Sequence, residues 1–298
     1  MRIGTRGSAL AIAQAQFVAA LLGDDTEIVK ITTLGDRGVA VVDKSRWVSE
    51  LERALLDGRI EVAVHSAKDV PTELTEGLEL VAVPARADAR DAICGAASLA
   101  DLPVGARIGT SSVRRAAQIR AARSDVEVVE LRGNVDTRLR KLAEGQVDAL
   151  VLAYAGLQRL RRGEAAGGLI SEFVPAAGQG ALALEARPGA LGSDRLARVI
   201  DPDAMACVTA ERALVAALGA SCHTPVGAHA SRIGENRIEL TGWVGLPDGS
   251  AWLSDRVGGE PGAVEAVGAK CARRMQAAGA QELLREAESE LSAGQPGA

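Results

Sequence analysis

The chain has 298 residues, of which 47% are hydrophobic and 24% are charged, a balance typical of a folded protein with a sizeable core. Aromatic residues make up only 2%, which argues against single-stranded nucleic-acid binding because such proteins stack bases on aromatic side chains. The formal net charge of −5 gives no general attraction to nucleic acid or to anionic membranes. Any anion must therefore be recognised by local clusters of Arg and Lys.

The sequence indicates neither export nor a metal site. A secretory signal has a charged segment, then an apolar stretch and a cleavage site, and residues 1–6 (MRIGTR) do not begin such a pattern. No uninterrupted apolar run approaches the roughly 20 residues that span a bilayer. The four cysteines lie far apart, and three histidines are too few for a convincing metal cluster. We expect a cytoplasmic monomer that binds no metal, membrane or nucleic acid.

In the first two-thirds of the chain, short β-branched runs alternate with amphipathic stretches, a pattern typical of α/β folds with largely parallel sheets. Several expected helices follow a strand almost at once, as βαβ units require. No internal repeat stands out. The expected strands are 27–32, 61–65, 78–83, 108–110, 126–131 and 149–152, and the expected helices are 9–22, 48–56, 113–123 and 135–143.

Composition changes near residues 84–91 and again near 175–180, which predicts an inserted domain joined by two crossings, with a cleft beside it. A third region begins near Asp201 with a helix over 203–218. Short strands near 226–230, 237–245 and 251–257 then favour an antiparallel sheet with helices on one side. The predicted domains are residues 1–86 with 178–200, residues 87–177, and residues 201–298.

Basic residues stand where a helix is expected to begin after a strand. In the segment 109–115 (GTSSVRR), Ser111 or Ser112 is a natural N-cap. The N–H groups at a helix start favour an anion, whereas Arg114 and Arg115 oppose the helix dipole. A bound anionic ligand would remove this conflict, and the alternative is a solvated pair of surface arginines.

The same arrangement recurs at two other expected strand ends. Residues 131–138 (LRGNVDTR) place Arg132 after a strand and Arg138 in the first turn of the next helix, and Arg6 ends the first strand just before Ser8. Ligands of open α/β sheets collect at the carboxyl ends of the strands. Three such ends with Arg predict a small polyanionic ligand, because the fork of Arg binds carboxylates bidentately.

Two further segments carry a carboxylate and a thiol. Lys68 and Asp69 follow another expected strand, where they could form a casual ion pair or, in a site rich in Arg, offer a carboxylate to positively charged or N–H-bearing groups. Cys222 lies in a loop beside His223, where it could be a reactive thiolate. Spacing alone does not say what it reacts with. The other cysteines fit small buried hydrophobic residues: Cys94, Cys207 and Cys271.

Taken together, these segments resemble the hydroxymethylbilane synthase (porphobilinogen deaminase) family. Each stretch alone is weak, but seven in the family's order leave little room for coincidence. A Gly-Trp strand followed by Asp-Gly continues the likeness to about residue 250. The stretches are IGTRGS (3–8), VHSAKDVP (64–71), GTSSVRR (109–115), LRGNVDTR (131–138), AGLQRL (155–160), GQGA (178–181) and CHTPVG (222–227).

The resemblance implies two α/β domains like those of periplasmic binding proteins with an active-site cleft between them, plus a smaller C-terminal α+β domain with an antiparallel sheet. In this family the cysteine matching Cys222 carries a dipyrromethane cofactor through a thioether. Four porphobilinogen molecules are joined in turn with loss of ammonia, and hydrolysis releases 1-hydroxymethylbilane. The implied partner is this small-molecule substrate.

The implied chemistry explains the residue types. The growing chain carries acetate and propionate groups, so it is a polyanion that needs several bidentate cations. Asp69 matches the family's catalytic carboxylate, which would bind pyrrole N–H groups, assist departure of ammonia and stabilise a cationic azafulvene. By the same match Lys68, Thr110, Ser112, Arg114 and Arg115 would hold the cofactor, and Arg6, Ser8, Arg132, Arg138, Arg159 and Gln179 would bind substrate or the growing chain.

One segment departs from the family pattern. The family usually has a longer loop containing Gly and Lys where this chain has residues 35–47, so we expect altered behaviour of the lid. Lys44 and Trp47 could take the places of a loop lysine and of an aromatic residue that covers the cleft.

Other interpretations of the chain stay open. A two-lobed anion-binding protein, or a relative that binds but turns over poorly, would share the fold, although a binding protein has no use for Cys222. A cysteine hydrolase using Cys222 with His65, His223 or His229 would leave the arginines at the strand ends unexplained.

Overall fold

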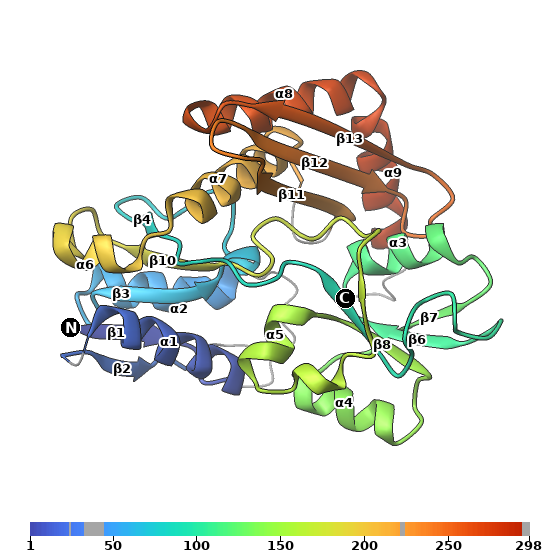
Figure 1. Ribbon diagram of the computed structural model, residues 1–298, viewed down its shortest axis with the longest axis horizontal. Helices are drawn as coiled ribbons and strands as arrows, with labels where there is room; N and C mark the ends of the chain where they lie inside the picture. Colours follow the sequence, from blue (N-terminus) through green and yellow to red (C-terminus); the bar gives the residue numbers. More distant parts are fainter. Residues whose placement is uncertain (24, 33–44, 221–223, 294–298) are drawn as a thin grey trace. The chain divides into compact units, whose positions relative to one another are not determined.

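The structure is a computed structural model that describes residues 1–23, 25–32, 45–220 and 224–293 (Figure 1). Contacts divide the chain into two units, Met1–Ala87 with Gly178–Val208 and Asp88–Ala177 with Thr209–Ala298. The division into three domains stays a prediction. Among the described residues, no helix is both long and apolar enough to cross a membrane.

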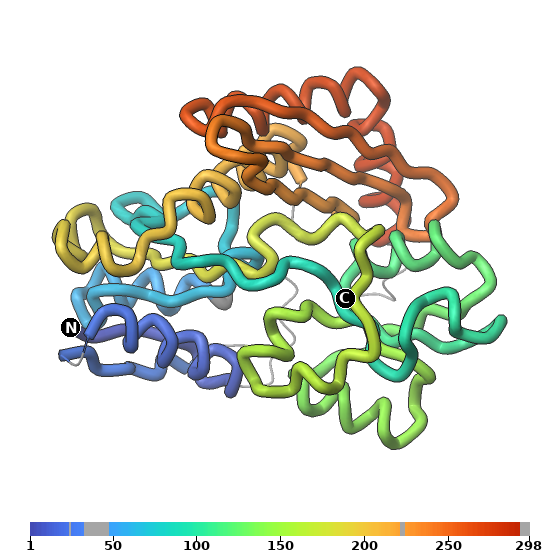
Figure 2. The backbone as a smooth tube through the Cα atoms, viewed as in Figure 1, coloured from blue at the N-terminus to red at the C-terminus, as the bar shows by residue number. Residues whose placement is uncertain are grey.

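A five-stranded mixed sheet forms the centre of the first unit, with the strand order β2-β1-β3-β10-β4. β1 runs parallel to β2 and β3, whereas β10 lies antiparallel between β3 and β4. Figure 2 shows how β10, from late in the chain, completes the sheet begun by the first strands. The elements are β1 (Arg2–Thr5), α1 (Ala9–Leu22), β2 (Glu27–Lys30), α2 (Ser45–Leu56), β3 (Val62–Ser66), the short 3-10 helix η2 (Ala67–Asp69), β4 (Glu79–Ala82), β10 (Leu182–Ala186) and α6 (Gly192–Val199).

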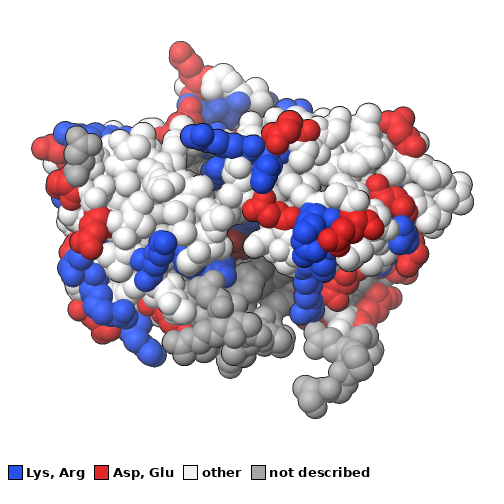
Figure 3. All heavy atoms as spheres, turned by 90° about the horizontal axis from the view of Figure 1, so that it is seen from below, with Lys and Arg blue, Asp and Glu red and all other residues white. Residues whose placement is uncertain are grey.

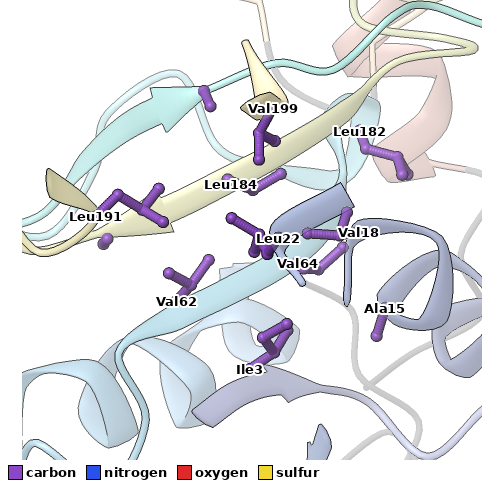
Figure 4. Packing of buried hydrophobic residues seen from close by; sticks show 12 residues of the cluster. Ile3, Ala15, Val18, Leu22, Val62, Val64, Leu182, Leu184, Leu191 and Val199 are labelled. Carbon is purple, nitrogen blue, oxygen red and sulfur yellow. The ribbon is translucent and has the colours of Figure 1, made fainter. Parts of the chain in front are cut away.

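Alternate residues of β3 face two different layers of helices, as the strand geometry requires. Val62 and Val64 pack with Val18 of α1 in one apolar cluster, and Ala63 packs with residues of α2 in another. In Figure 4, side chains of the first cluster reach from β3, β10 and α1 toward one another. Because both faces of the sheet are covered, polar side chains gather at the ends of its strands.

The second unit contains another five-stranded sheet, with the order β7-β6-β8-β5-β9. β6 is parallel to β7 and β8, and β5 lies antiparallel between β8 and β9. Ile119 of α3 packs with Ile108 on one face, while Leu157 of α5 packs with Leu150 on the other. The elements are β5 (Asp91–Cys94), β6 (Arg107–Thr110), α3 (Val113–Ala122), β7 (Glu127–Glu130), α4 (Val135–Ala143), β8 (Ala149–Ala153), α5 (Tyr154–Arg159), η3 (Gly163–Ala165) and β9 (Gly168–Ile170).

The two sheets share one strand arrangement, and a short sequence repeats with it. The tetrapeptide RIGT forms both β1 and β6. The Arg of each copy pairs with the carboxylate just before the third strand of its sheet, Arg2 with Glu61 and Arg107 with Asp148. Only four residues recur, and the antiparallel strand comes last in one sheet and first in the other.

The rest of the second unit contains an antiparallel three-stranded sheet, as expected, with the order β11-β12-β13. Helices α7 and α8 cover one face, since a Cβ added at Gly242 of β12 would meet Leu214 of α7 and Met275 of α8. The elements are α7 (Pro202–Ala217), which begins in the first unit, β11 (Val226–Arg232), β12 (Ile238–Gly245), β13 (Trp252–Gly259), η4 (Pro261–Ala263), α8 (Val264–Ala277) and α9 (Ala280–Ala293).

The expected helices and strands are confirmed within a few residues, but the expectation of largely parallel sheets is wrong. In each five-stranded sheet, two of the four strand pairings are antiparallel. The missed strands are β5, β9 and β10. β5 and β10 are buried along their whole length and so show no alternation, and β9 has only three residues.

Candidate functional site

A pocket opens at the carboxyl end of β3 in the first unit. Arg6, Ser8 and Asp69 all line it, so three of the residues predicted from the sequence come together there. Ser8 also caps α1, because its Oγ accepts a hydrogen bond from the Ala11 N–H at 3.2 Å. The other lining residues are Leu10, Ala11, Gln14, Val48, Val64, His65 and Ser66.

Asp69 is held at the pocket by η2, the short turn that follows β3. A Cβ added at Gly178 would lie 2.8 Å from the Ala67 carbonyl carbon and 2.9 Å from the Lys68 N, so the turn is pressed against this glycine. Gly178 also has a φ of +72°, which glycine adopts without strain. Lys68 therefore lies beside the segment that carries Gln179, whose side chain is buried.

One of the pocket-lining residues, His65, forms a buried pair with Glu185. His65 Nε2 is 3.0 Å from Glu185 Oε2, and the two residues are 6% and 0% exposed. They share one face of the sheet because β3 and β10 place His65 opposite Ala183 and Glu185 opposite Ala63. Apolar clusters that include these two alanines flank the pair. Each partner thus offsets the cost of burying the other.

In the second unit, hydroxyl groups gather where β6 ends and α3 begins. Ser112 is the N-cap, as expected, and its Oγ accepts a hydrogen bond from the Arg115 N–H at 3.4 Å. Thr110 Oγ1 accepts from the Ser112 N–H at 3.2 Å. Ser111 Oγ accepts from Arg138 of α4 at 2.8 Å. Three elements thus bring hydroxyl and guanidinium groups to one edge of this sheet.

Arg114 and Arg115 are both bound by a carboxylate of their own unit, that of Asp91. Its Oδ2 accepts a hydrogen bond from Arg114 Nη2 at 2.7 Å, and its Oδ1 accepts from Arg115 Nε at 2.9 Å. The exposed fractions are 1% for Asp91, 3% for Arg114 and 6% for Arg115. Burial raises the pKa of Asp91, but attraction to the two guanidinium groups outweighs it and holds the pKa well below its usual range.

The negative charge of Asp91 offsets the unfavourable interaction of the two arginines with the dipole of α3, so the protein itself supplies the anion. Asp91 was not among the residues predicted from the sequence, because a lone Asp at the start of a buried strand has no local signature. The predicted contact of Arg114 and Arg115 with a cofactor stays a prediction.

The other predicted arginines of this unit differ in exposure. Burial, helped by the positive charge of Arg115, lowers the pKa of Arg138 to about 10. Burial likewise lowers the pKa of Arg159 to about 10. Arg132 is 77% exposed at its side chain and pairs with Glu130 at 2.6 Å. A guanidinium that has lost water attracts an anion more strongly than a hydrated one, so Arg138 and Arg159 would attract an anion more strongly than Arg132.

Cys222 lies outside the described residues, as do Lys44 and the side chain of Trp47, but the strand that follows Cys222 is described. In β11, the Ala228 N–H donates to the Pro175 carbonyl at 2.8 Å. The neighbouring Val174 carbonyl accepts from Arg114 Nη1 at 2.7 Å. This segment therefore links Arg114 to the strand that follows Cys222.

The other three cysteines are buried. Burial raises the pKa of Cys94 and of Cys271 to about 11, and Cys207 is 5% exposed. The thiolate is the reactive form of cysteine, so these thiols are poor nucleophiles in the folded chain.

The face that Figure 3 shows has no charge of a single sign. On the face shown in Figure 3, acidic and basic side chains are interspersed. Within the described ranges, no three His, Cys, Asp or Glu residues are grouped so as to hold a metal ion.

The fold is that of an α/β protein whose strand ends carry guanidinium groups suited to an anion and, at the end of β3, a carboxylate, a combination suited to an enzyme. A family model described as "Porphobilinogen deaminase, dipyromethane cofactor binding domain" matches residues 1–192. A second, described as "Porphobilinogen deaminase, C-terminal domain", matches residues 205–277. The chain belongs to the porphobilinogen deaminase family, which confirms the resemblance, and it is a transferase with a dipyrromethane cofactor.

Curated relatives match almost the whole chain. The porphobilinogen deaminase of Deinococcus deserti is 46% identical, covering 95% of this chain and 97% of that protein. That of Thermus thermophilus is 44% identical, covering 95% of this chain and 98% of that protein. Among solved structures, a periplasmic substrate-binding protein from Coxiella burnetii is similar with a TM-score of 0.41 and 15% identity, covering 66% of this chain and 88% of that one.

Proposed function

We propose that the chain joins four molecules of porphobilinogen head to tail, with loss of ammonia at each step, and hydrolyses the product to 1-hydroxymethylbilane. The observation that carries the proposal is the pocket where Asp69 stands with Arg6 and Ser8. Porphobilinogen has acetate and propionate groups, a pyrrole N–H and an aminomethyl group. The pocket offers a cation and a hydroxyl to the carboxylates and a carboxylate to the nitrogen groups.

Asp69 acts on the nitrogen-bearing part of the substrate. Its carboxylate accepts hydrogen bonds from pyrrole N–H groups and stabilises the positive charge that develops at the aminomethyl carbon as ammonia leaves. Proton transfer through the same carboxylate assists that departure. Asp69 is the one carboxylate among the described lining residues of the pocket, so this role falls on it.

The described residues fit a dipyrromethane tethered at Cys222. Only five peptide steps separate Cys222 from Gly227 along the chain. Gly227 packs on Val174, whose carbonyl is bound by Arg114. When bound, the group supplies the pyrrole carbon to which the first substrate is joined. Its carboxylates would be held by Arg114, Arg115, Lys68, Thr110 and Ser112.

The remaining cations and polar groups would hold the substrate and the lengthening chain. Arg138 and Arg159 have lost part of their hydration, which strengthens their attraction to carboxylates. Arg132 is more exposed and can adjust its position as the chain grows. The full set is Arg6, Ser8, Arg132, Arg138, Arg159 and Gln179.

We also propose that the chain works as a monomer in the cytoplasm, with porphobilinogen as its partner. The net charge of −5 and the interspersed charges in Figure 3 support the absence of a nucleic-acid partner.

Turnover of porphobilinogen by the Asp69→Asn variant tests the reaction. The wild-type chain should release four ammonia molecules for each linear tetrapyrrole, measured together in one assay. The variant should fold but lose about 100-fold or more in kcat, because the amide cannot offset developing positive charge. A rate near that of the wild type would remove Asp69 from the mechanism. A wild-type chain that binds porphobilinogen without releasing ammonia would contradict the function.

A further inference from the structure

Asp91 is a buried carboxylate to which the proposed reaction assigns no step. It is the first residue of β5, and each of its oxygens receives a different arginine from the first turn of α3. Arg115 makes a second contact through Nη2 at 2.8 Å. One small side chain therefore contacts both guanidinium groups.

The same arginines are connected to β11 through residues 174 and 175. Val174 is held from α3 by Gln118, whose Nε2 donates to its carbonyl at 3.0 Å and whose Oε1 accepts from its N–H at 2.7 Å. A Cβ added at Gly227 would lie 2.7 Å from the Val174 carbonyl oxygen, so β11 approaches this segment closely. Arg114 binds that same oxygen. Contacts therefore run without a break from Asp91 to the strand that follows Cys222.

We propose that Asp91 is a positioning residue for the tethered cofactor: it fixes Arg114 and Arg115 at a set place relative to the strand that follows the tether. The inference rests on the proposed function, in which these arginines bind carboxylates of a group attached at Cys222. Asp91 acts through them and touches neither cofactor nor substrate. Preorganised donors bind an anion better than donors that must first be gathered. Without Asp91, two like charges in a dry site repel each other and leave these positions.

A second Asp–Arg contact of the same sheet provides the control. Arg107 and Asp148 are joined at 2.9 Å, but their side chains are 41% and 42% exposed. Arg107 begins β6 and Asp148 precedes β8, so this pair lies at the amino ends of parallel strands, away from the ends that carry Thr110 and Ser112. Asp148→Asn therefore removes the same charge from the same fold without touching the arginine pair of α3.

The test is the loading of cofactor onto full-length chain produced in cells that make no porphobilinogen. Wild-type, Asp91→Asn and Asp148→Asn chains are incubated with porphobilinogen, and intact mass gives the fraction that carries the dipyrromethane. The concentration that gives half-loading should rise about tenfold or more in Asp91→Asn, because a buried charge pair has lost one partner. It should change by less than about twofold in Asp148→Asn. Half-loading of Asp91→Asn at the wild-type concentration would overturn the proposal.

A double-mutant cycle with Arg115→Gln separates positioning from a structural role. If Asp91 acts through the arginines, Asp91→Asn should change half-loading much less in the Arg115→Gln background than in the wild type. Equal changes in both backgrounds would contradict the proposal. The double variant has the net charge of the original triad, so it can be compared with Arg115→Gln even where Asp91→Asn alone fails to fold. A wild-type chain that acquires no added mass would refute the proposed function itself, which is a separate result.

Discussion

The proposed function assigns three arginines to the same polyanion, but their side chains differ greatly in burial. These are Arg132, Arg138 and Arg159. Burial lowers the pKa of Arg138 and of Arg159 to about 10, whereas the side chain of Arg132 is 77% exposed. A half-buried guanidinium contributes to the fold as well as to a ligand. An exposed one contributes little to stability, so its substitution reports on binding alone.

Exchanging Arg132 for Lys should therefore separate catalysis from stability. Its ion pair with Glu130 is exposed, and such pairs contribute about 0–1 kcal/mol, so the free energy of unfolding should change by less than about 1 kcal/mol. Lys keeps the charge but loses the bidentate fork, so kcat/KM for porphobilinogen should fall about tenfold. Denaturant unfolding and steady-state kinetics measure the two effects. A loss of stability with normal kinetics would indicate a structural role instead.

At the scale of elements, the short turn η2 is placed by a glycine from a distant part of the chain. Gly178 has a positive φ and lies against the backbone of Ala67 and Lys68. Two separate costs therefore follow from adding a methyl group there, one from the backbone conformation and one from overlap. Gly105 has a similar φ of +76° but nothing within 4 Å of an added Cβ.

The pair Gly178→Ala and Gly105→Ala should separate these two costs. A side chain at this φ costs about 1–2 kcal/mol, which both variants share. Overlap with the η2 backbone should add about 1–3 kcal/mol in Gly178→Ala alone, and because η2 carries Asp69, turnover should fall in that variant only. Chemical denaturation and porphobilinogen turnover give the two values. Equal losses of stability in both variants would show that η2 can move away without cost.

Local sequence signals predict the helices that begin directly after a strand. α1, α3 and α4 follow strands and begin after Ser8, Ser112 and Asn134, each of which caps its helix through the side chain, so local signals suffice. β10 is buried on both faces, and its antiparallel pairing with β3 depends on a return of the chain after about one hundred residues. Local pattern carries no information about such a partner.

At the scale of the whole molecule, the order of the family's motifs along the chain predicted more of the site residues than the chemistry of single residues did. Arg6, Ser8 and Asp69 were predicted from two strand ends, and the structure brings them to one pocket. Asp91 and Glu185 could not be predicted, since each acquires its role only from a neighbour on another element: Arg114 and Arg115 for the first, His65 for the second. Buried ion pairs are tertiary features, and a single sequence does not show them.

We expect the cofactor to be attached at Cys222, because the other three thiols are buried and two of them have a pKa of about 11. Intact-mass analysis of the purified, full-length chain tests it directly. The wild-type chain should weigh more than its sequence by one dipyrromethane, and Cys222→Ala should abolish that excess while Cys207→Ala retains it. An active wild-type chain with the mass of its bare sequence would contradict the account.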